Sequence, residues 1–243
     1  MTHIELKNLT KEFYLQGERT IKDLIPSLIQ GKSFAKKHVV LNDISFSLEK
    51  GGTLGVVGKN GAGKSTLMKL IAGVTYPTTG SIEVNGKVAP LIELGAGFHH
   101  ELNGYENIYL NAAILGMHKK EIELIERDII EFSGIEEFLH EPLKRFSTGM
   151  VMRLAFSVAV HIHAEILLID EVLAVGDYEF QEKCLAKLEE IKKQKDVTIV
   201  YISHDEATVT AFCDRAILLH NGHLILDDTP SAVFKKYHNL DNS

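Results

Sequence analysis

Residues 53–66 read TLGVVGKNGAGKST, which predicts a buried strand, a glycine-rich loop and the start of a helix. Gly58, Gly61 and Gly63 allow backbone angles and close approaches that a Cβ would forbid. The loop amides then point at phosphate groups at the positive end of the helix. This order of elements predicts a site for a nucleoside triphosphate, and a chance glycine turn is the weaker interpretation.

Two residues of the loop have individual roles in this prediction. Lys64 supplies a positive charge between the phosphates, and the Ser65 hydroxyl is placed to ligate Mg²⁺. The expected nucleotide contacts are Gly58, Asn60, Gly61, Ala62, Gly63, Lys64, Ser65 and Thr66.

A second acidic stretch fits the same site. Residues 165–171 read EILLIDE, an apolar strand that ends in two carboxylates. Ligands of parallel sheets bind at the carboxyl ends of the strands, so Asp170 is expected to bind Mg²⁺. Neighbouring strand residues point to opposite faces, so Glu171 is expected to act as the base that polarises the attacking water. A solvated acidic turn is the alternative, and the phosphate loop disfavours it.

Two further positions are candidates for phosphate contacts. His204 follows the apolar strand 197–202 and is expected to hydrogen-bond the γ-phosphate or hold the attacking water, although a lone histidine among 12 is usually structural. Ser147 resembles a helix N-cap, and Thr148 and Gly149 leave amides at the helix start. The residues alone leave two interpretations of this turn equally open: a site for a partner subunit's nucleotide, or ordinary capping.

Composition limits the classes that remain. The chain has 243 residues, 45% of them hydrophobic, and a net charge of −7, which disfavours nonspecific binding to nucleic acid or anionic membranes. The two cysteines, Cys184 and Cys213, have no metal-type spacing and are expected to be buried in a reducing compartment. His3, Glu5 and Lys7 interrupt the start, and no apolar run approaches the roughly 20 residues of a membrane span. A soluble, cytosolic protein is expected, with any membrane role acting through a partner.

The alternation of strands and helices predicts an α/β fold with a mostly parallel sheet covered on both faces. Helical spacing dominates residues 105–140, another helix is expected at 148–163, and a short helix is expected within 20–28. Asn85-Gly86 and Asn221-Gly222 predict two hairpins, 81–92 and 215–226. A helical subdomain of about residues 94–163 is expected to be inserted between the phosphate loop and the next core strand.

These motifs in this order resemble the ATP-binding subunits of ABC transporters, over nearly the whole chain. Residues 58–66 match that family's Walker A motif, 166–170 match Walker B, and Glu171 matches the catalytic glutamate. Residues 147–150 take the place of the signature motif, and His204 that of the switch histidine. The resemblance implies a P-loop core with an antiparallel β subdomain (1–93 and 164–240) and a helical subdomain (94–163) within a single domain of residues 1–240. It also implies that two copies sandwich ATP head to tail. The resemblance therefore favours the interpretation in which the signature turn contacts the nucleotide of a partner subunit.

Departures from the usual motifs narrow the subfamily. The strings FSTGM, EVLAVGD and ELGAGF together resemble the polysaccharide exporters, and the O-antigen (Wzt-type) subunits in particular. Glu93 occupies the position of the usual Q-loop glutamine and is expected to act as a weaker Mg²⁺ sensor, since a carboxylate cannot donate an amide proton. In this family an aromatic residue near the first strand stacks on adenine, and Phe13 and Tyr14 are the two candidates. Motif spacing does not distinguish between them, and packing in the core is the alternative role for each.

The expected function is therefore ATP hydrolysis coupled to export of a lipid-linked polysaccharide, with O antigen as the first expectation. Capsule or teichoic acid export, and a non-transport ABC ATPase, are the alternatives. The resemblance implies ATP and Mg²⁺ as cofactors, and a second copy and an integral-membrane channel subunit as partners. No nucleic acid is expected, and the implied location is peripheral, at the cytoplasmic face of the bacterial inner membrane. The sequence ends at Ser243, just after the last expected helix, so no carboxyl-terminal carbohydrate-binding domain is expected within it.

Three other classes share the phosphate loop. Chromosome and DNA-repair ATPases split this domain by long coiled coils, and no sustained heptad lies between the loop and Ser147. Translation-factor relatives have two such domains, whereas this chain has a single phosphate loop. Residues 147–150 and His204 disfavour a kinase or GTPase outside the family.

Overall fold

The computed structural model describes residues 1–15, 36–91, 95–170 and 176–241. The expected helix at 20–28 lies outside these residues. The described strands are β1 (Thr2–Leu15), β2 (Lys36–Glu49), β3 (Thr53–Val57), β4 (Thr79–Val84), β5 (Val88–Leu91), β6 (Ile166–Ile169), β7 (Thr198–Ile202), β8 (Arg215–His220) and β9 (His223–Asp228). The described α-helices are α2 (Lys64–Ile71), α3 (Gly104–Ile114), α4 (Lys119–Ser133), α5 (Thr148–His161), α6 (Tyr178–Lys193), α7 (Glu206–Phe212) and α8 (Pro230–Asp241).

A six-stranded sheet with the order β5-β6-β7-β3-β8-β9 forms the centre of the molecule. All of its pairings are parallel except that of β8 with β9. The central strands β3, β6 and β7 are buried at every position, as expected for strands covered on both faces. The mostly parallel α/β fold that the sequence predicts is therefore confirmed.

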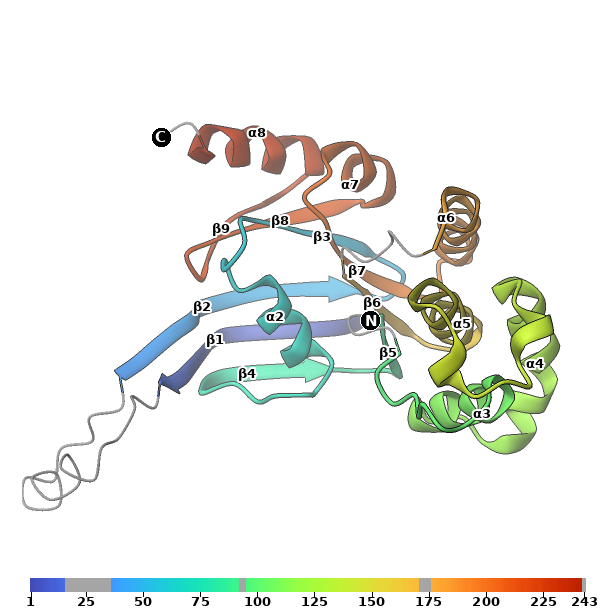
Figure 1. Ribbon diagram of the computed structural model, residues 1–243. Helices are drawn as coiled ribbons and strands as arrows, with labels where there is room; N and C mark the ends of the chain where they lie inside the picture. Colours follow the sequence, from blue (N-terminus) through green and yellow to red (C-terminus); the bar gives the residue numbers. More distant parts are fainter. Residues whose placement is uncertain (16–35, 92–94, 171–175, 242–243) are drawn as a thin grey trace, which may run out of the picture.

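Alternate residues of these strands enter two different apolar clusters. Leu167, Ile169 and Tyr201 pack with residues of α5, α6, α7 and α8 on one face. Leu168 and Val200 pack on the other face with α2 and with strands β1 and β2. This division follows from the two-residue period of a strand. Figure 1 shows α7 and α8 above the six-stranded sheet and the strands β1, β2 and β4 below it.

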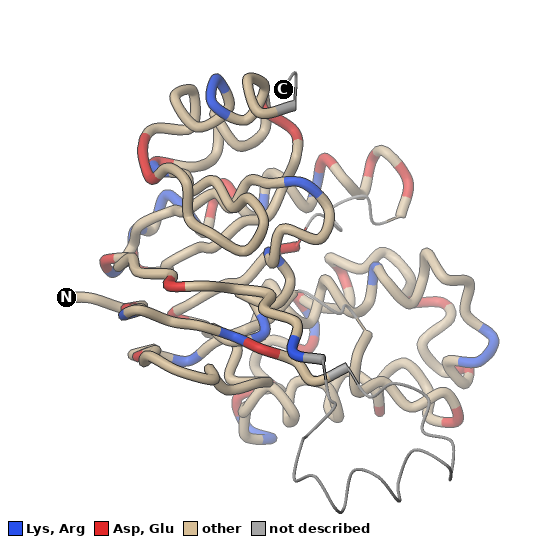
Figure 2. The backbone as a smooth tube through the Cα atoms, turned by 90° about the vertical axis from the view of Figure 1, so that its left-hand side faces the viewer, with Lys and Arg blue, Asp and Glu red and all other residues tan. Residues whose placement is uncertain are grey.

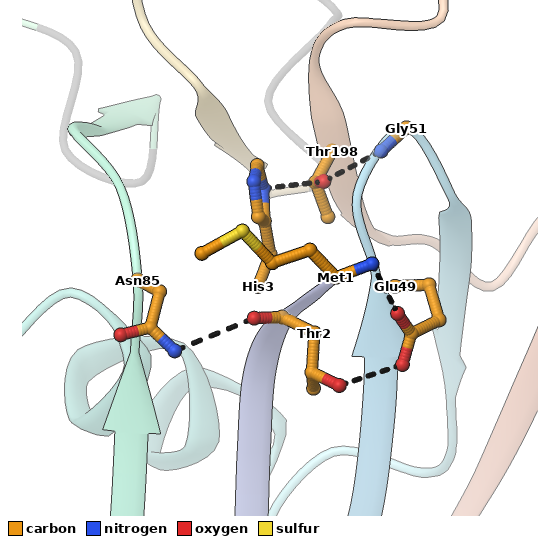
Figure 3. Close-up of polar contacts among 7 residues, drawn as sticks. All are labelled: Met1, Thr2, His3, Glu49, Gly51, Asn85 and Thr198. Atoms are coloured by element: carbon orange, nitrogen blue, oxygen red, sulfur yellow. Dashed lines mark hydrogen bonds and ion pairs between the residues drawn. The ribbon is translucent and has the colours of Figure 1, made fainter.

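A separate three-stranded antiparallel sheet has the order β2-β1-β4. Polar contacts join its first strand to the central sheet (Figure 3). The buried His3 on β1 places Nδ1 2.9 Å from the Thr198 hydroxyl of β7, and the same hydroxyl accepts the Gly51 amide at 3.0 Å. The two sheets therefore share a hydrogen-bonded junction as well as an apolar core.

The hairpin predicted for residues 81–92 is wrong. β4 pairs with β1 in the antiparallel sheet, whereas β5 pairs in parallel with β6 in the central sheet. A two-residue type I′ turn needs positive φ at both central residues. Of Asn85 and Gly86, only Gly86 has a positive φ. In contrast, Asn221 (φ 48°) and Gly222 (φ 78°) both have a positive φ, and they connect β8 and β9 in a hairpin as predicted. The Asn85 amide instead donates to the His3 carbonyl at 2.8 Å, and the chain then crosses to the other sheet.

The helices α3, α4 and α5 pack around an apolar cluster of their own, which includes Ile108, Ile129 and Leu154. Figure 1 shows them gathered at one side of the central sheet, next to α6. Acidic and basic residues are interspersed along the described backbone (Figure 2). No described helix is both long and apolar enough to cross a membrane.

Candidate nucleotide site

The glycine-rich loop joins the end of β3 to the start of α2 at the carboxyl edge of the central sheet. The register aligns Val56 with Ile202 of β7, and Tyr201 with Ile169 of β6. The residues that follow these three strands therefore meet at one edge. This alignment brings the phosphate loop, Asp170 and His204 into one region, as the sequence predicts.

Two glycines of the loop sit where a side chain would collide with the protein. A Cβ at Gly58, whose φ is +157°, would lie 2.3 Å from the Leu219 carbonyl oxygen. A Cβ at Gly63 (φ +105°) would lie 2.5 Å from the side chain of Leu41 on β2. The loop is thus fixed between the central sheet and the antiparallel sheet. Gly63 also caps α2 without a side-chain hydrogen bond, which leaves the first amides of the helix available to an anion.

Lys64 folds back over the loop. Its Nζ donates to the carbonyl oxygens of Gly58 at 2.6 Å and Lys59 at 3.1 Å. Burial lowers the pKa of Lys64, and the charge of Asp170 opposes that change. Burial likewise raises the pKa of Asp170, and Lys64 opposes the rise. A half-buried cation and carboxylate thus influence each other at the mouth of the loop.

The residues present suit a magnesium nucleotide. Mg²⁺ prefers oxygen ligands and is usually held by one or two carboxylates together with substrate phosphates. The hydroxyl of Ser65, exposed at the start of α2, and the carboxylate of Asp170 are oxygen donors of this kind. Among the described residues, no group of three His, Cys, Asp or Glu side chains could hold a metal alone. Glu93 and Glu171 lie outside the described residues.

His204 lies exposed just beyond β7, before the helix α7. Asp205, the next residue, caps α7 by accepting the Thr208 amide at 2.8 Å. The amide of Asp205 also donates to the Ser203 hydroxyl at 3.0 Å. The turn that presents His204 is therefore fixed on both sides.

The signature turn begins α5, in the layer of helices. The Ser147 hydroxyl accepts the Met150 amide at 3.2 Å, which confirms the predicted N-cap. Ser147 and Thr148 are exposed. α5 packs against α3, α4, α6 and β5. The turn therefore presents its polar groups to the surrounding solvent.

Phe13 and Tyr14 are both exposed, by 43% and 59%, near the end of β1. The ammonium group of Lys11 lies 4.9 Å from the centre of the Phe13 ring and donates to Thr75, just after α2. Lys37 lies 5.8 Å from the Tyr14 ring and pairs with Glu12. The lysine beside Phe13 therefore reaches the segment between α2 and β4, whereas the lysine beside Tyr14 belongs to β2.

Two residues of the helical layer received no role from the sequence. Arg153 of α5 pairs with Asp177, the N-cap of α6. Asn107 of α3 is fully buried and donates to the backbone carbonyls of His99, Leu102 and Asn103 at 2.8–3.1 Å. Asn107 and Asn111 recur at helical spacing beside Ile108 and Ala112, and this pattern is the signal that could have identified Asn107.

A glycine-lined phosphate loop after β3, with a carboxylate at the same edge of the sheet after β6, defines a nucleoside triphosphatase. Residues 41–174 match the ABC transporter family, and this chain belongs to that family as an ATP-binding, ATP-hydrolysing subunit. This finding agrees with the resemblance of the motifs.

Two relatives and one solved structure illustrate the similarity. The chain is 46% identical over 225 residues to the O-antigen export system ATP-binding protein RfbB of Klebsiella pneumoniae, covering 91% of each chain. It is 41% identical to the teichoic acids export ATP-binding protein TagH of Bacillus anthracis, covering 91% of this chain and 40% of that one. A dimeric post-hydrolysis structure of an ATP-binding cassette with ADP and Pi superposes with a TM-score of 0.74 at 20% identity, covering 93% of this chain and 98% of the other.

Proposed function

We propose that this chain is the ATPase subunit of an exporter that moves a lipid-linked polysaccharide, O antigen, across the cytoplasmic membrane from its cytoplasmic face. The observation that supports this substrate is the 46% identity to an O-antigen export ATP-binding protein over 91% of both chains. Export of teichoic acid is the second candidate, because TagH is 41% identical over 91% of this chain.

The chemistry is divided among the residues at the carboxyl edge of the sheet. The loop amides and Lys64 hold the β- and γ-phosphates, and Ser65 and Asp170 hold Mg²⁺, which supplies charge neutralisation when bound. Glu171 polarises the attacking water as general base, and His204 contacts the γ-phosphate. Glu93 senses the metal.

Phe13, rather than Tyr14, stacks on the adenine ring. Leu41 of β2 packs against Gly63, and its partner across the sheet is Lys11 of β1. Residues directly opposite each other in an antiparallel pair share a face. Lys11 and Phe13 are in contact, so Phe13 is on the face that meets the phosphate loop.

The signature turn completes the site of a second copy. Residues 94–163 act as one helical subdomain, and its own apolar cluster supports this division. The exposure of Ser147 and Thr148 at the start of α5, with Gly149 next to them, supports this role. Head-to-tail pairing of two copies brings each signature turn to the γ-phosphate held by the other, as the two-fold symmetry of a homodimer allows.

An apolar pocket of about 190 Å³ receives the cytosolic part of the integral-membrane partner. It lies where α2, β5, α3 and α5 meet, and Ile114 and Val74 on its walls are 59% and 69% exposed. Exposed apolar side chains that gather at a pocket mark an interaction site. The lining residues are Lys69, Ala72, Val74, Pro90, Gly95, Ala96, Asn111, Ile114, Leu115, Ala155 and Ala159.

Mixing two inactive variants tests the shared site. Lys64→Ala removes the loop cation, and Gly149→Asp places a carboxylate at the signature turn, where a Cβ has room, since its nearest neighbour is the Ser147 hydroxyl at 3.9 Å. A mixed dimer contains one site with both changes and one intact site. We expect each variant alone to be inactive and the mixture to regain hydrolysis. A mixture that stays as inactive as its components would contradict the head-to-tail site.

Reconstitution with the membrane subunit tests the substrate. Proteoliposomes that contain both subunits and lipid-linked O-antigen polysaccharide should move it only with ATP, and Glu171→Gln should abolish the movement. A matched preparation with lipid-linked teichoic acid distinguishes the two candidates. Transport of teichoic acid alone would replace the first proposal with the second.

A further inference from the structure

A lysine near the end of β1 lies against an exposed aromatic ring. Nζ of Lys11 is 4.9 Å from the centre of the Phe13 ring, within the distance at which a cation is attracted to an aromatic face. Phe13 remains 43% exposed, so part of its surface is accessible to a ligand. The ring is therefore held by a charge on one side and open to solvent on another.

The same ammonium group binds the segment that follows α2. It donates to the Thr75 hydroxyl at 2.8 Å and to the Tyr76 carbonyl oxygen at 2.7 Å. The Val74 amide, one residue before Thr75, donates to the Lys69 carbonyl oxygen in the last turn of α2 at 2.9 Å. Because α2 begins directly after the phosphate loop, Lys11 connects the aromatic ring to the helix that carries this loop.

Hydrogen bonds on both sides of Lys11 fix the strand to the same segment. The Thr78 amide donates to the Thr10 carbonyl oxygen at 2.8 Å, and the Glu12 amide donates to the Thr78 hydroxyl at 2.9 Å. β1 then pairs with β4 from Thr10 and Thr79 onward. The backbone that carries the lysine is thus held in place, and its side chain has a fixed origin.

A second connection joins Lys11 to the phosphate loop through β2. The residue opposite Lys11 in the antiparallel sheet is Leu41. The Leu41 side chain would lie 2.5 Å from a Cβ built at Gly63, the last glycine of the loop. Residues directly opposite each other share a face of the sheet. Lys11 is therefore related to the phosphate loop both through α2 and through β2.

We propose that Lys11 is a positioning residue that holds the Phe13 ring where it stacks on adenine, at a fixed place relative to the phosphate loop. This inference rests on the proposed stacking of Phe13 on adenine. A side chain that is ordered before binding has less freedom to lose when the ligand arrives, so preorganisation raises affinity. Lys11 acts on the base through the ring and leaves the binding of the phosphates unchanged.

The experiment compares the affinities for ADP and for pyrophosphate by titration calorimetry. The two ligands share a diphosphate and differ by the adenosine, so their comparison separates the base from the phosphates. Lys11→Met keeps an unbranched side chain but removes the charge and the N–H donors. Lys37→Met is the matched control, because it removes a lysine whose Nζ lies 5.8 Å from the ring of Tyr14.

Lys11→Met should bind ADP about three- to tenfold more weakly, the range expected when one side chain must be ordered on binding. Its affinity for pyrophosphate should match that of the parent, and Lys37→Met should match the parent for both ligands. The double variant of Lys11→Met and Phe13→Ala should bind ADP as Phe13→Ala does, because the lysine acts only through the ring.

Thermal unfolding of each variant checks the fold. Lys11→Gln keeps a donor for Thr75 but has no charge over the ring, so it should show the same selective loss of ADP affinity. It replaces Lys11→Met in the comparison if the methionine variant is unstable. A lysine that only tethered the two segments would change the unfolding temperature and leave the ratio of the two affinities unchanged.

Three results would overturn the positioning role. They are parental ADP affinity in Lys11→Met and Lys11→Gln, an equal loss of affinity for ADP and pyrophosphate, and losses that add in the double variant with Phe13→Ala. Parental ADP affinity in Phe13→Ala would instead remove the proposed stacking, and this inference with it. Weakened ADP binding by Phe13→Ala together with parental binding by both Lys11 variants would refute the role of Lys11 alone.

Discussion

His3 and Thr198 are 195 residues apart in the sequence, yet Nδ1 of the histidine and Oγ1 of the threonine are separated by 2.9 Å. Both residues are buried, and they join the antiparallel sheet to the central sheet (Figure 3). The Thr198 hydroxyl accepts the Gly51 amide at 3.0 Å and is also hydrogen-bonded to Nδ1 of His3. One hydroxyl thus satisfies two groups from two other segments of the chain.

Replacing this hydroxyl with a methyl group should destabilise the fold. Thr198→Val keeps the shape but leaves the Gly51 amide and the His3 ring without their partner, at a cost of about 1–3 kcal/mol in the free energy of unfolding. Urea denaturation measures this difference. Thr2→Val is the control: its hydroxyl donates to Glu49 at 2.7 Å on the exposed surface, and its loss should cost no more than about 0.5 kcal/mol. Equal effects of the two substitutions would contradict the junction.

The effect of Asp170→Asn on stability should depend on pH. Burial raises the pKa of Asp170 above its ordinary value of 3.8, so the folded parent loses stability as the pH rises from 3.8 through the raised value. The asparagine side chain of Asp170→Asn does not ionise, so this variant has no such pH-dependent loss of stability. The stability of Asp170→Asn relative to the parent should therefore increase with pH in this window and stay constant above it, as followed by denaturation between about pH 4 and pH 7.

Asp205→Asn is a control for which we expect the opposite pH dependence of stability. The hydroxyl and the amide of Thr208 lower the pKa of Asp205, so this carboxylate contributes stability above its ordinary pKa that is lost as the pH falls. The stability of Asp205→Asn relative to the parent should therefore decrease as the pH rises. Parallel trends for the two variants would contradict the assignment of burial as the cause at Asp170.

Adenine binding should separate the two aromatic residues of β1. Phe13→Ala removes the ring on the face of the phosphate loop and should weaken ATP binding by about tenfold, since stacking of a base on an aromatic ring is worth roughly 1–3 kcal/mol. Tyr14→Ala should bind ATP as the parent does, and Phe13→Tyr should retain affinity. Titration calorimetry compares the three. The reverse order of Phe13→Ala and Tyr14→Ala would place adenine on the other face.

Coupling to the membrane subunit should depend on the apolar pocket. Ile114→Asp places a charge on its wall, so it should abolish stimulation of ATP hydrolysis by the reconstituted membrane subunit while the rate of the isolated chain stays unchanged. Leu124→Asp is the matched control, because Leu124 is 82% exposed on α4 and is not part of the pocket. Stimulation that survives Ile114→Asp, or is lost equally in both variants, would contradict docking at this pocket.

The sequence predicts local features of this fold well and relations between distant segments poorly. The phosphate loop, the capped signature helix and the buried strands all follow from patterns within about 15 residues. Both cysteines are buried as predicted, and burial raises the pKa of each thiol to about 12. Such features depend mainly on the chain next to them.

The features that the sequence did not predict correctly concern which distant segments of the chain contact each other. Asn85-Gly86 and Asn221-Gly222 are identical pairs, and only the second joins a hairpin, because the first lies where the chain passes from one sheet to the other. Spacing could not choose between Phe13 and Tyr14, since the choice depends on which face of β1 meets α2. The Arg153–Asp177 pair spans 24 residues and joins two helices that meet through tertiary packing, which includes the contact of Phe156 with Phe180.

Leu41 belongs to the antiparallel sheet, yet its side chain fills the space beside Gly63 where any Cβ would collide. The backbone of the β8–β9 turn approaches the same strand, and the Asn42 amide donates to the Gly222 carbonyl at 2.8 Å. A chimera that grafts the first two strands from another ATPase would thus import part of the phosphate cradle as well. Such a graft should succeed only when the donor's residue at position 41 has a shape compatible with the recipient's loop.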